Sequence, residues 1–181
     1  MKYETVIERV YEPGRLLDAW QRVKRNAGAA GVDEMSVRDF ERRKPELMKL
    51  IYEKLKSGVY RFKPARRVLI PKEGSTKLRK LGIPGVMDRV VAASIKEEFE
   101  EIFAPEFSES NYGFLRGKSQ HQAIRHVQKI VNEGYEWCAA IDLKSFFDNI
   151  PQGLILKLIR RKIADERLVT LIARSLKAGV M

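Results

Sequence analysis

Apolar positions recur at helical spacing over most of this chain. Leu16, Trp20 and Val23 place one apolar face on a helix over residues 14–26. A second helix is expected after the approximate capping box of Ser36 and Asp39. Three more are expected from Pro45 to Gly58, from Asp88 to Phe103 and from Ser119 to Gly134. Two helices are expected after Pro151, and Asp165 caps the second of them.

Two segments have the pattern of strands instead. Val68–Ile70 ends at Pro71, a glycine-serine turn follows, and Leu78–Ile83 returns, which predicts an antiparallel hairpin. Trp137–Ile141 is an uninterrupted apolar run, which predicts a strand buried on both faces with Asp142 at its C-terminal end. Helices combined with a small antiparallel sheet indicate an α+β fold.

Two further segments carry expectations about exposure. Residues 26–33 are rich in Gly and Ala, which predicts a surface loop and, from composition alone, equally a flexible linker. On the helix from Asp88 to Phe103, four glutamates are expected to be solvated and to point away from any nucleic acid. They are Glu97, Glu98, Glu100 and Glu101.

The net charge of the chain indicates which classes of partner it can bind. Its 181 residues carry 35 Lys and Arg against 24 Asp and Glu, a net charge of +11 with an isoelectric point near 9.8. This balance favours a polyanionic partner, nucleic acid first and an anionic membrane surface second. Between residues 61 and 80 a single acid opposes a cluster of cations that suits phosphate contacts, with a solubilising role as the alternative. The cations of this basic hairpin are Arg61, Lys63, Arg66, Arg67, Lys72, Lys77, Arg79 and Lys80.

Several classes of protein are disfavoured. No apolar run approaches the roughly 20 residues of a membrane span, and the N-terminus lacks a signal-peptide pattern. The single cysteine, Cys138, cannot form an intramolecular disulfide, and one Cys with two His cannot make a standard structural zinc site. The length suits one domain, or one and a part.

Asp142 is the first candidate for chemistry. A carboxylate at the end of a strand either caps the next element or holds a metal, and spacing alone leaves both open. The string from Asp142 to Ile150 resembles the first catalytic motif of the group II intron reverse transcriptase/maturase family. The resemblance implies that Asp142 and the backbone carbonyl of Leu143 bind two catalytic Mg²⁺ ions, and that Phe147 packs under the sugar of the incoming nucleotide. Two such ions clamp the attacking and leaving oxygens in phosphoryl transfer.

Other strings extend the resemblance. Segments 31–34, 66–72, 81–84 and 110–121 are similar to motifs of the fingers and of the template-contacting loop in the same family. Similarity to the fingertip of retroviral reverse transcriptases implies that Lys72 and Arg79 grip the triphosphate. The loop motif implies that Arg116 and Lys118 meet the template strand. The chain departs from the family pattern where Glu34 replaces Gly, Lys80 replaces Pro, and Leu115-Arg116 replaces Arg-Pro.

The resemblance implies a right-hand polymerase. Residues 1–135 would form helix-rich fingers with a small antiparallel sheet, and residues 136–181 the beginning of the palm, before the Tyr-x-Asp-Asp motif. It implies an RNA-directed DNA polymerase of the bacterial cytoplasm or an organelle that binds intron RNA, an RNA template with its DNA primer, and dNTP, and that supports splicing and intron mobility. A non-catalytic RNA-binding splicing cofactor on the same scaffold is the alternative.

Two expectations concern the 181-residue chain by itself. The other metal-binding carboxylates of the family do not occur in these residues, so we expect no polymerase activity from this chain alone. An unpaired strand edge and exposed apolar faces in the final third favour association with a second copy, which predicts a homodimer.

Overall fold

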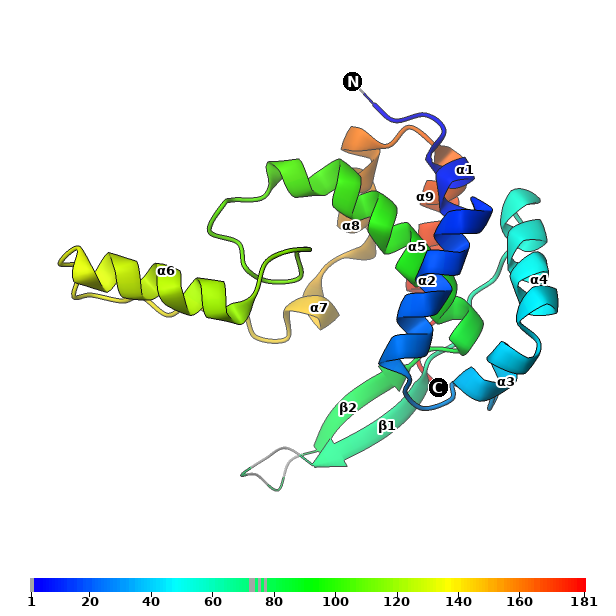
Figure 1. The fold of residues 1–181 in the computed structure, drawn as a ribbon, viewed down its shortest axis with the longest axis horizontal. Coiled ribbons are helices and arrows are strands. Elements are labelled where there is room, and N and C mark those ends of the chain that lie inside the picture. Colours follow the sequence, from blue (N-terminus) through cyan, green and yellow to red (C-terminus); the bar gives the residue numbers. More distant parts are fainter. Residues whose placement is uncertain (1, 72–73, 75, 77) are drawn as a thin grey trace. The chain divides into compact units, whose positions relative to one another are not determined.

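The computed structural model describes residues 2–71, 74, 76 and 78–181 (Figure 1). Its elements in chain order are α1 (Val6–Val10), α2 (Pro13–Asn26), α3 (Val37–Arg42), α4 (Lys44–Lys56), β1 (Arg66–Pro71), β2 (Leu78–Ile83), α5 (Val86–Phe103), the 3₁₀ helix η1 (Ala104–Glu106), α6 (Gln120–Asn132), α7 (Phe146–Asn149), α8 (Gln152–Lys162) and α9 (Glu166–Lys177). The predicted hairpin and long helices are confirmed, with ends that differ by about two residues. The short helices α1 and α7 were not expected.

The chain forms two compact units. The first unit contains Met1–Glu98 and Gln152–Met181, and the second unit contains Phe99–Pro151. These units do not coincide with a boundary at residue 135, because α8 and α9 belong with the N-terminal helices. The assignment of the two halves to fingers and palm stays a prediction.

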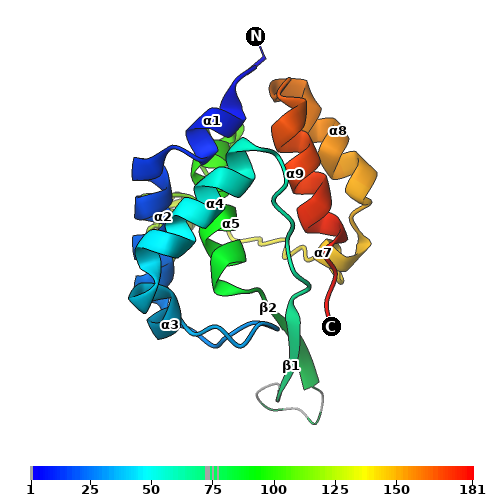
Figure 2. The ribbon, with the colours of Figure 1, turned by 90° about the vertical axis from the view of Figure 1, so that its right-hand side faces the viewer.

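The core of the first unit is built from buried apolar side chains of α1, α2, α3, α4, α5, α8 and α9 (Figure 2). Trp20 of α2 stacks on Phe40 of α3 with ring centroids 4.2 Å apart, and both side chains are fully buried. The backbone of Tyr3 donates to Lys162 O and accepts from Ala164 N, both at 2.8 Å. Asp165, which caps α9 as predicted, also accepts from the backbone N–H of Ile7 at 2.9 Å. One carboxylate therefore both begins α9 and fastens it to α1.

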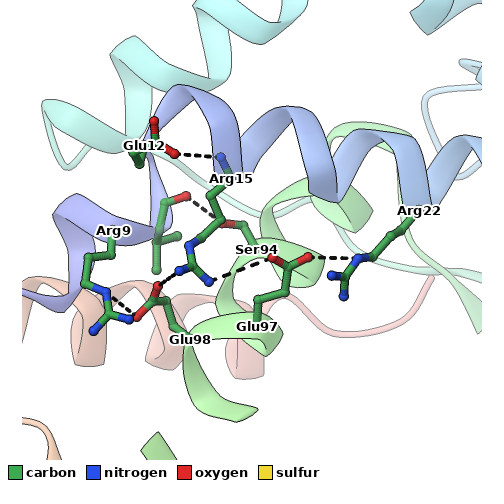
Figure 3. A network of polar contacts seen from close by, with 8 residues as sticks. Arg9, Glu12, Arg15, Arg22, Ser94, Glu97 and Glu98 are labelled. Carbon is green, nitrogen blue, oxygen red and sulfur yellow. Dashed lines mark hydrogen bonds and ion pairs between the residues drawn. The ribbon is translucent and has the colours of Figure 1, made fainter. Parts of the chain in front are cut away.

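A buried ion-pair network joins α5 to α2 (Figure 3). The Glu98 carboxylate is completely buried and lies 2.8 Å from Arg15 and 3.1 Å from Arg9, while Glu97 pairs with Arg22 at 3.1 Å. The expectation that these glutamates are solvated is therefore wrong for Glu97 and Glu98. Both carboxylates leave water because arginines of the N-terminal segment supply the opposite charge.

The predicted helix starts are confirmed in detail. Ser36 and Asp39 form a reciprocal capping box at α3, and Ser119 with Gln122 forms another at α6. Glu12 was not expected as a cap, yet its carboxylate accepts from the backbone N–H groups of Gly14 and Arg15 at 3.0 and 2.7 Å. These caps satisfy N–H groups that have no partner inside their helix.

The segment before α7 differs from its prediction. The strand expected over Trp137–Ile141 is absent from the structure. The backbone there is irregular, and the side chains of Trp137 and Ile141 are 97% and 88% exposed. Cys138, expected inside the strand, is exposed. A strand is stable only when neighbouring backbone pairs with its N–H and C=O groups. Within the described residues the only sheet is β1–β2, so the apolar run has no partner strand.

The second unit contains one long amphipathic helix with an uncovered apolar side. On α6, Ile124, Val127 and Val131 are each more than half exposed. The loop before α6 is held by Tyr112, whose hydroxyl lies 2.9 Å from His126 Nδ1. Over the residues that the structure describes, we find no helix with the length and hydropathy of a membrane span.

Candidate nucleic-acid interface

The register of β1 with β2 sorts the hairpin cations onto two faces. Arg66 and Arg79 lie on one face, and Arg67 and Lys80 lie on the other. At about 3.4 Å per residue pair, the first two are roughly 14 Å apart along the hairpin and the second two roughly 7 Å apart. Each face therefore presents two fixed cations.

These four cations are available to a partner. All four side chains are exposed, and none of the ion pairs between described residues includes them. Cations held on a protruding surface without acidic partners suit phosphate oxygens. Lys72 and Lys77, which the sequence places on the same hairpin, lie outside the described residues.

A hydrogen-bonded cluster holds the base of the hairpin. Asp88 accepts from Tyr60 Oη at 2.8 Å and from the backbone N–H of Lys63 at 3.1 Å. The Lys63 ammonium reaches the other way and pairs with Asp33 at 3.2 Å. Burial raises the pKa of Asp88, against the lowering effect of its two hydrogen bonds, and burial beside this carboxylate raises the pKa of Tyr60. Lys63 thus has a structural role in addition to the RNA contact predicted for it.

Residues 26–33, expected as a surface loop or a flexible linker, pack against this base. Gly31 lies so close to the hairpin that a methyl group in place of its hydrogen would sit 2.6 Å from Gly85 N. Arg89 holds the same loop by donating to Ala27 O at 3.0 Å and to Ala29 O at 2.8 Å. The interpretation as a flexible linker is therefore wrong. No spacing rule connects residues this far apart in sequence, so sequence reasoning missed the contacts of Gly31, Asp33 and Asp88.

The C-terminal residues support β1 from its other side. Ala65 N donates to Gly179 O at 3.0 Å, Met181 N donates to Ala65 O at 2.9 Å, and Arg67 N donates to Met181 O at 2.7 Å. Figure 2 shows the C-terminus beside the start of β1. An isolated two-stranded hairpin is marginally stable in water, and this additional pairing stiffens the end that meets the helices.

The predicted catalytic residues lie in the second unit. Asp142 and Leu143 are in the irregular segment, and both are exposed. Phe147 is 82% exposed on α7, with its ring 5.5 Å from that of Phe146. Mg²⁺ prefers six oxygen ligands in octahedral geometry. Among the described residues no group of three or more His, Cys, Asp or Glu side chains could hold a metal, so Asp142 and Leu143 do not by themselves fit a two-ion centre.

The two cations expected to meet the template are placed by local contacts. Lys118 donates to Glu109 O at 3.0 Å and lies 4.9 Å from the centroid of the Tyr112 ring. The backbone N–H of Arg116 donates to Glu100 at 3.0 Å, and the Arg116 side chain is exposed. Both cations are accessible in the second unit, and their role in binding RNA stays a prediction.

The family of the chain follows from comparison with known proteins. Residues 70–176, from the end of β1 to α9, match the family model described as reverse transcriptase (RNA-dependent DNA polymerase). The chain belongs to the reverse transcriptase family.

Its relatives include intron-encoded proteins. The chain is 33% identical to the group II intron-encoded protein LtrA of Lactococcus lactis over 90% of its own length and 27% of that protein. It is 34% identical to the protein YkfC of Escherichia coli over 99% of its own length and 48% of that protein. It is also 36% identical, over 72% of its length, to a 91 kDa protein in the cob intron of Schizosaccharomyces pombe, covering 16% of that protein. The resemblance to group II intron reverse transcriptases is confirmed, and the chain spans about half or less of the length of these curated relatives.

Proposed function

We propose that this chain is an RNA-binding part of a group II intron reverse transcriptase, with the basic hairpin as its main nucleic-acid contact. The complete protein would copy an RNA template into DNA with dNTP and Mg²⁺, bind its intron RNA and assist splicing and intron mobility. Asp142 and Leu143 would supply part of the two-ion centre. Phe147, Arg79 and Lys72 would bind the nucleotide, and Arg116 and Lys118 would meet the template.

The observation that carries this proposal is the construction of the hairpin. Four exposed cations stand on two faces, without acidic partners among the described residues, on a base fixed by Asp33, Asp88 and the C-terminal segment. Fixed cations lose little conformational freedom when they meet phosphates, and each one that neutralises a phosphate releases counterions.

The alternative is a non-catalytic RNA-binding splicing cofactor on the same scaffold. Both functions need the hairpin, whereas only polymerisation needs a metal-binding carboxylate at position 142 and an aromatic at position 147. The presence of Asp142 and Phe147 favours the polymerase.

The experiment compares RNA binding by the 181-residue chain and two variants of equal charge. The hairpin variant carries Gln at positions 66, 67, 79 and 80. The control carries Gln in place of four exposed cations elsewhere on the first unit, namely Arg38, Lys49, Lys157 and Lys177. Affinity for a structured RNA is measured against salt concentration by fluorescence anisotropy.

The salt dependence distinguishes contact from general attraction. The wild-type chain should show a log–log slope of about −4 to −5, and loss of four phosphate contacts should reduce its magnitude by about 3. Between roughly 50 and 200 mM salt the wild type then loses about 60-fold more affinity than the hairpin variant. The control should keep most of the wild-type slope. Equal slopes for the two variants would show that only net charge matters and would overturn the assignment.

A further inference from the structure

A second cationic feature of the first unit lies away from both faces of the hairpin. A cavity of about 200 Å³ opens where the end of α4 meets α1 and α9. Ile7, Leu55 and Leu171 contribute apolar wall, and the rings of Tyr11 and Tyr60 also line it. Its charged lining residues are Lys56, Arg167 and Arg174, with no acidic residue among them.

The three cations differ in how their charge is compensated. Lys56 lies over the ring of Tyr52, with its Nζ 5.4 Å from the ring centroid. Arg167 pairs with Glu8 at 2.6 Å and with Asp165 at 3.3 Å, so two carboxylates offset its charge. Arg174 is half-buried and instead donates from Nη1 to two neutral carbonyls, Gly58 O at 2.6 Å and Tyr60 O at 3.4 Å. These bonds orient the guanidinium on the cavity wall but leave its positive charge without a counter-ion among the described contacts.

We propose that this cavity binds a phosphate group, with Arg174 as its principal ligand and Lys56 as a second cation. The guanidinium fork matches the oxygens of phosphate, and the carbonyl bonds made by Nη1 leave Nε and Nη2 for the anion. The volume lies below the roughly 300 Å³ at which sites for drug-sized ligands begin. A phosphate with an adjoining sugar suits such a space, with the sugar against the apolar wall.

The position of the cavity connects it to the hairpin. Tyr60 lines the cavity, and Arg66 begins β1 six residues later, which is at most about 20 Å of extended chain. Figure 2 shows this segment running from the end of α4 to β1 within the first unit. Arg61 and Lys63 lie on it, so cations continue from the cavity to the hairpin. The phosphate can therefore come from an RNA backbone that follows this path or from a free phosphate compound.

The test begins with inorganic phosphate alone. Titration into the ¹⁵N-labelled chain should shift the backbone amide signals of Ser57, Gly58 and Tyr60, and sodium acetate at equal ionic strength should not. The same shifts are expected in the hairpin variant, because the cavity does not depend on the hairpin cations. A failure of RNA binding at the hairpin is thereby distinguished from a failure at the cavity.

Variants of α9 locate the ligand. Arg174→Gln keeps a donor for Gly58 O but removes the charge, and should weaken phosphate binding by about tenfold or more. Arg174→Lys should restore part of it. Lys177→Gln, an equal charge change on the same helix outside the cavity, should bind as the wild type does. If Arg174→Gln does not fold, the wild-type titration decides alone.

The source of the phosphate is decided by adding a short RNA to the wild-type chain. Shifts of the same three amides assign the cavity to the RNA backbone, whereas RNA binding without them assigns it to a free phosphate compound; both outcomes keep the site. No specific shift with either phosphate or RNA, an equal response to acetate, or unchanged phosphate affinity in a folded Arg174→Gln variant would overturn the proposal.

Discussion

The contact between Gly31 and the base of the hairpin predicts that Gly31→Ala destabilises the protein. The added methyl carbon would lie 2.6 Å from Gly85 N, 2.7 Å from Gly85 Cα and 2.9 Å from Pro84 C. All three atoms belong to the backbone, which cannot rotate away as a flexible side chain does. Either the loop or the end of β2 must therefore move.

The size of the effect follows from the cost of overpacking. Inserting a methyl group into a closely packed site typically costs about 1–3 kcal/mol, and backbone neighbours place this case in the upper half of that range. For a chain of this length, about 2–3 kcal/mol lowers Tm by roughly 4–12 °C. The variant should stay folded, because a typical domain is stable by about 5–15 kcal/mol.

Urea and thermal unfolding followed by circular dichroism measure the difference. The matched control is Gly153→Ala in α8, where an added methyl group meets nothing within 4 Å. This control should be neutral or stabilising by up to about 1 kcal/mol, because Ala favours a helix over Gly. A Gly31→Ala variant as stable as the wild type would refute the close packing of the loop on the hairpin base.

Four other predictions follow from the structure. Glu98→Gln should cost about 2–3 kcal/mol in urea unfolding, because Arg15 loses its buried partner, whereas Arg9 is 43% exposed and water can solvate it. A loss below about 1 kcal/mol would contradict the buried pair. The backbone N–H of Gly14, followed by that of Arg15, lowers the pKa of Glu12 below its ordinary value of 4.5. The ionised Glu12 carboxylate therefore stabilises the fold fully above pH 4.5, and this stabilisation is lost as pH falls through the folded-state pKa. The difference in unfolding free energy between wild type and Glu12→Gln should shrink below about pH 4.5. A difference independent of pH would count against the cap. The 181-residue chain alone should show no primer extension above background with Mg²⁺, and extension that Asp142→Asn abolishes would prove the contrary. Sedimentation equilibrium at moderate salt should show self-association that weakens in Trp137→Ser, and a strict monomer at about 100 µM would exclude the homodimer.

The elements that the sequence predicts well are those set by neighbouring residues. The capping box of Ser36 and Asp39 and the cap at Asp165 depend on residues two or three positions away, and both are confirmed. The hairpin is also local, since only six positions of the sequence separate its two strands. Helical spacing similarly depends on residues within a few turns.

The failures are cases in which a distant segment decides the outcome. Glu98 has the spacing of a solvated glutamate, and it is buried because Arg9 and Arg15, more than 80 positions earlier, neutralise it. The run from Trp137 to Ile141 has the composition of a buried strand, but composition supplies no neighbouring strand to pair with it. Likewise, the segment around Gly31 has the composition of a linker, but Gly31 packs against the backbone of Gly85, 54 positions later.

The same distinction separates two kinds of residue at the nucleic-acid interface. Arg66, Arg67, Arg79 and Lys80 are exposed without acidic partners among the described residues, so replacing them should change binding and its salt dependence with little effect on stability. Asp33, Tyr60 and Asp88 hold the hairpin base through contacts between residues 25 to 30 positions apart, so replacing them should reduce stability and binding together. The charge of the hairpin is thus a local property of its sequence, whereas the orientation of the hairpin depends on contacts with other parts of the first unit. The cations of the hairpin can therefore be substituted without loss of the fold, whereas a substitution at the base also changes the orientation of those cations.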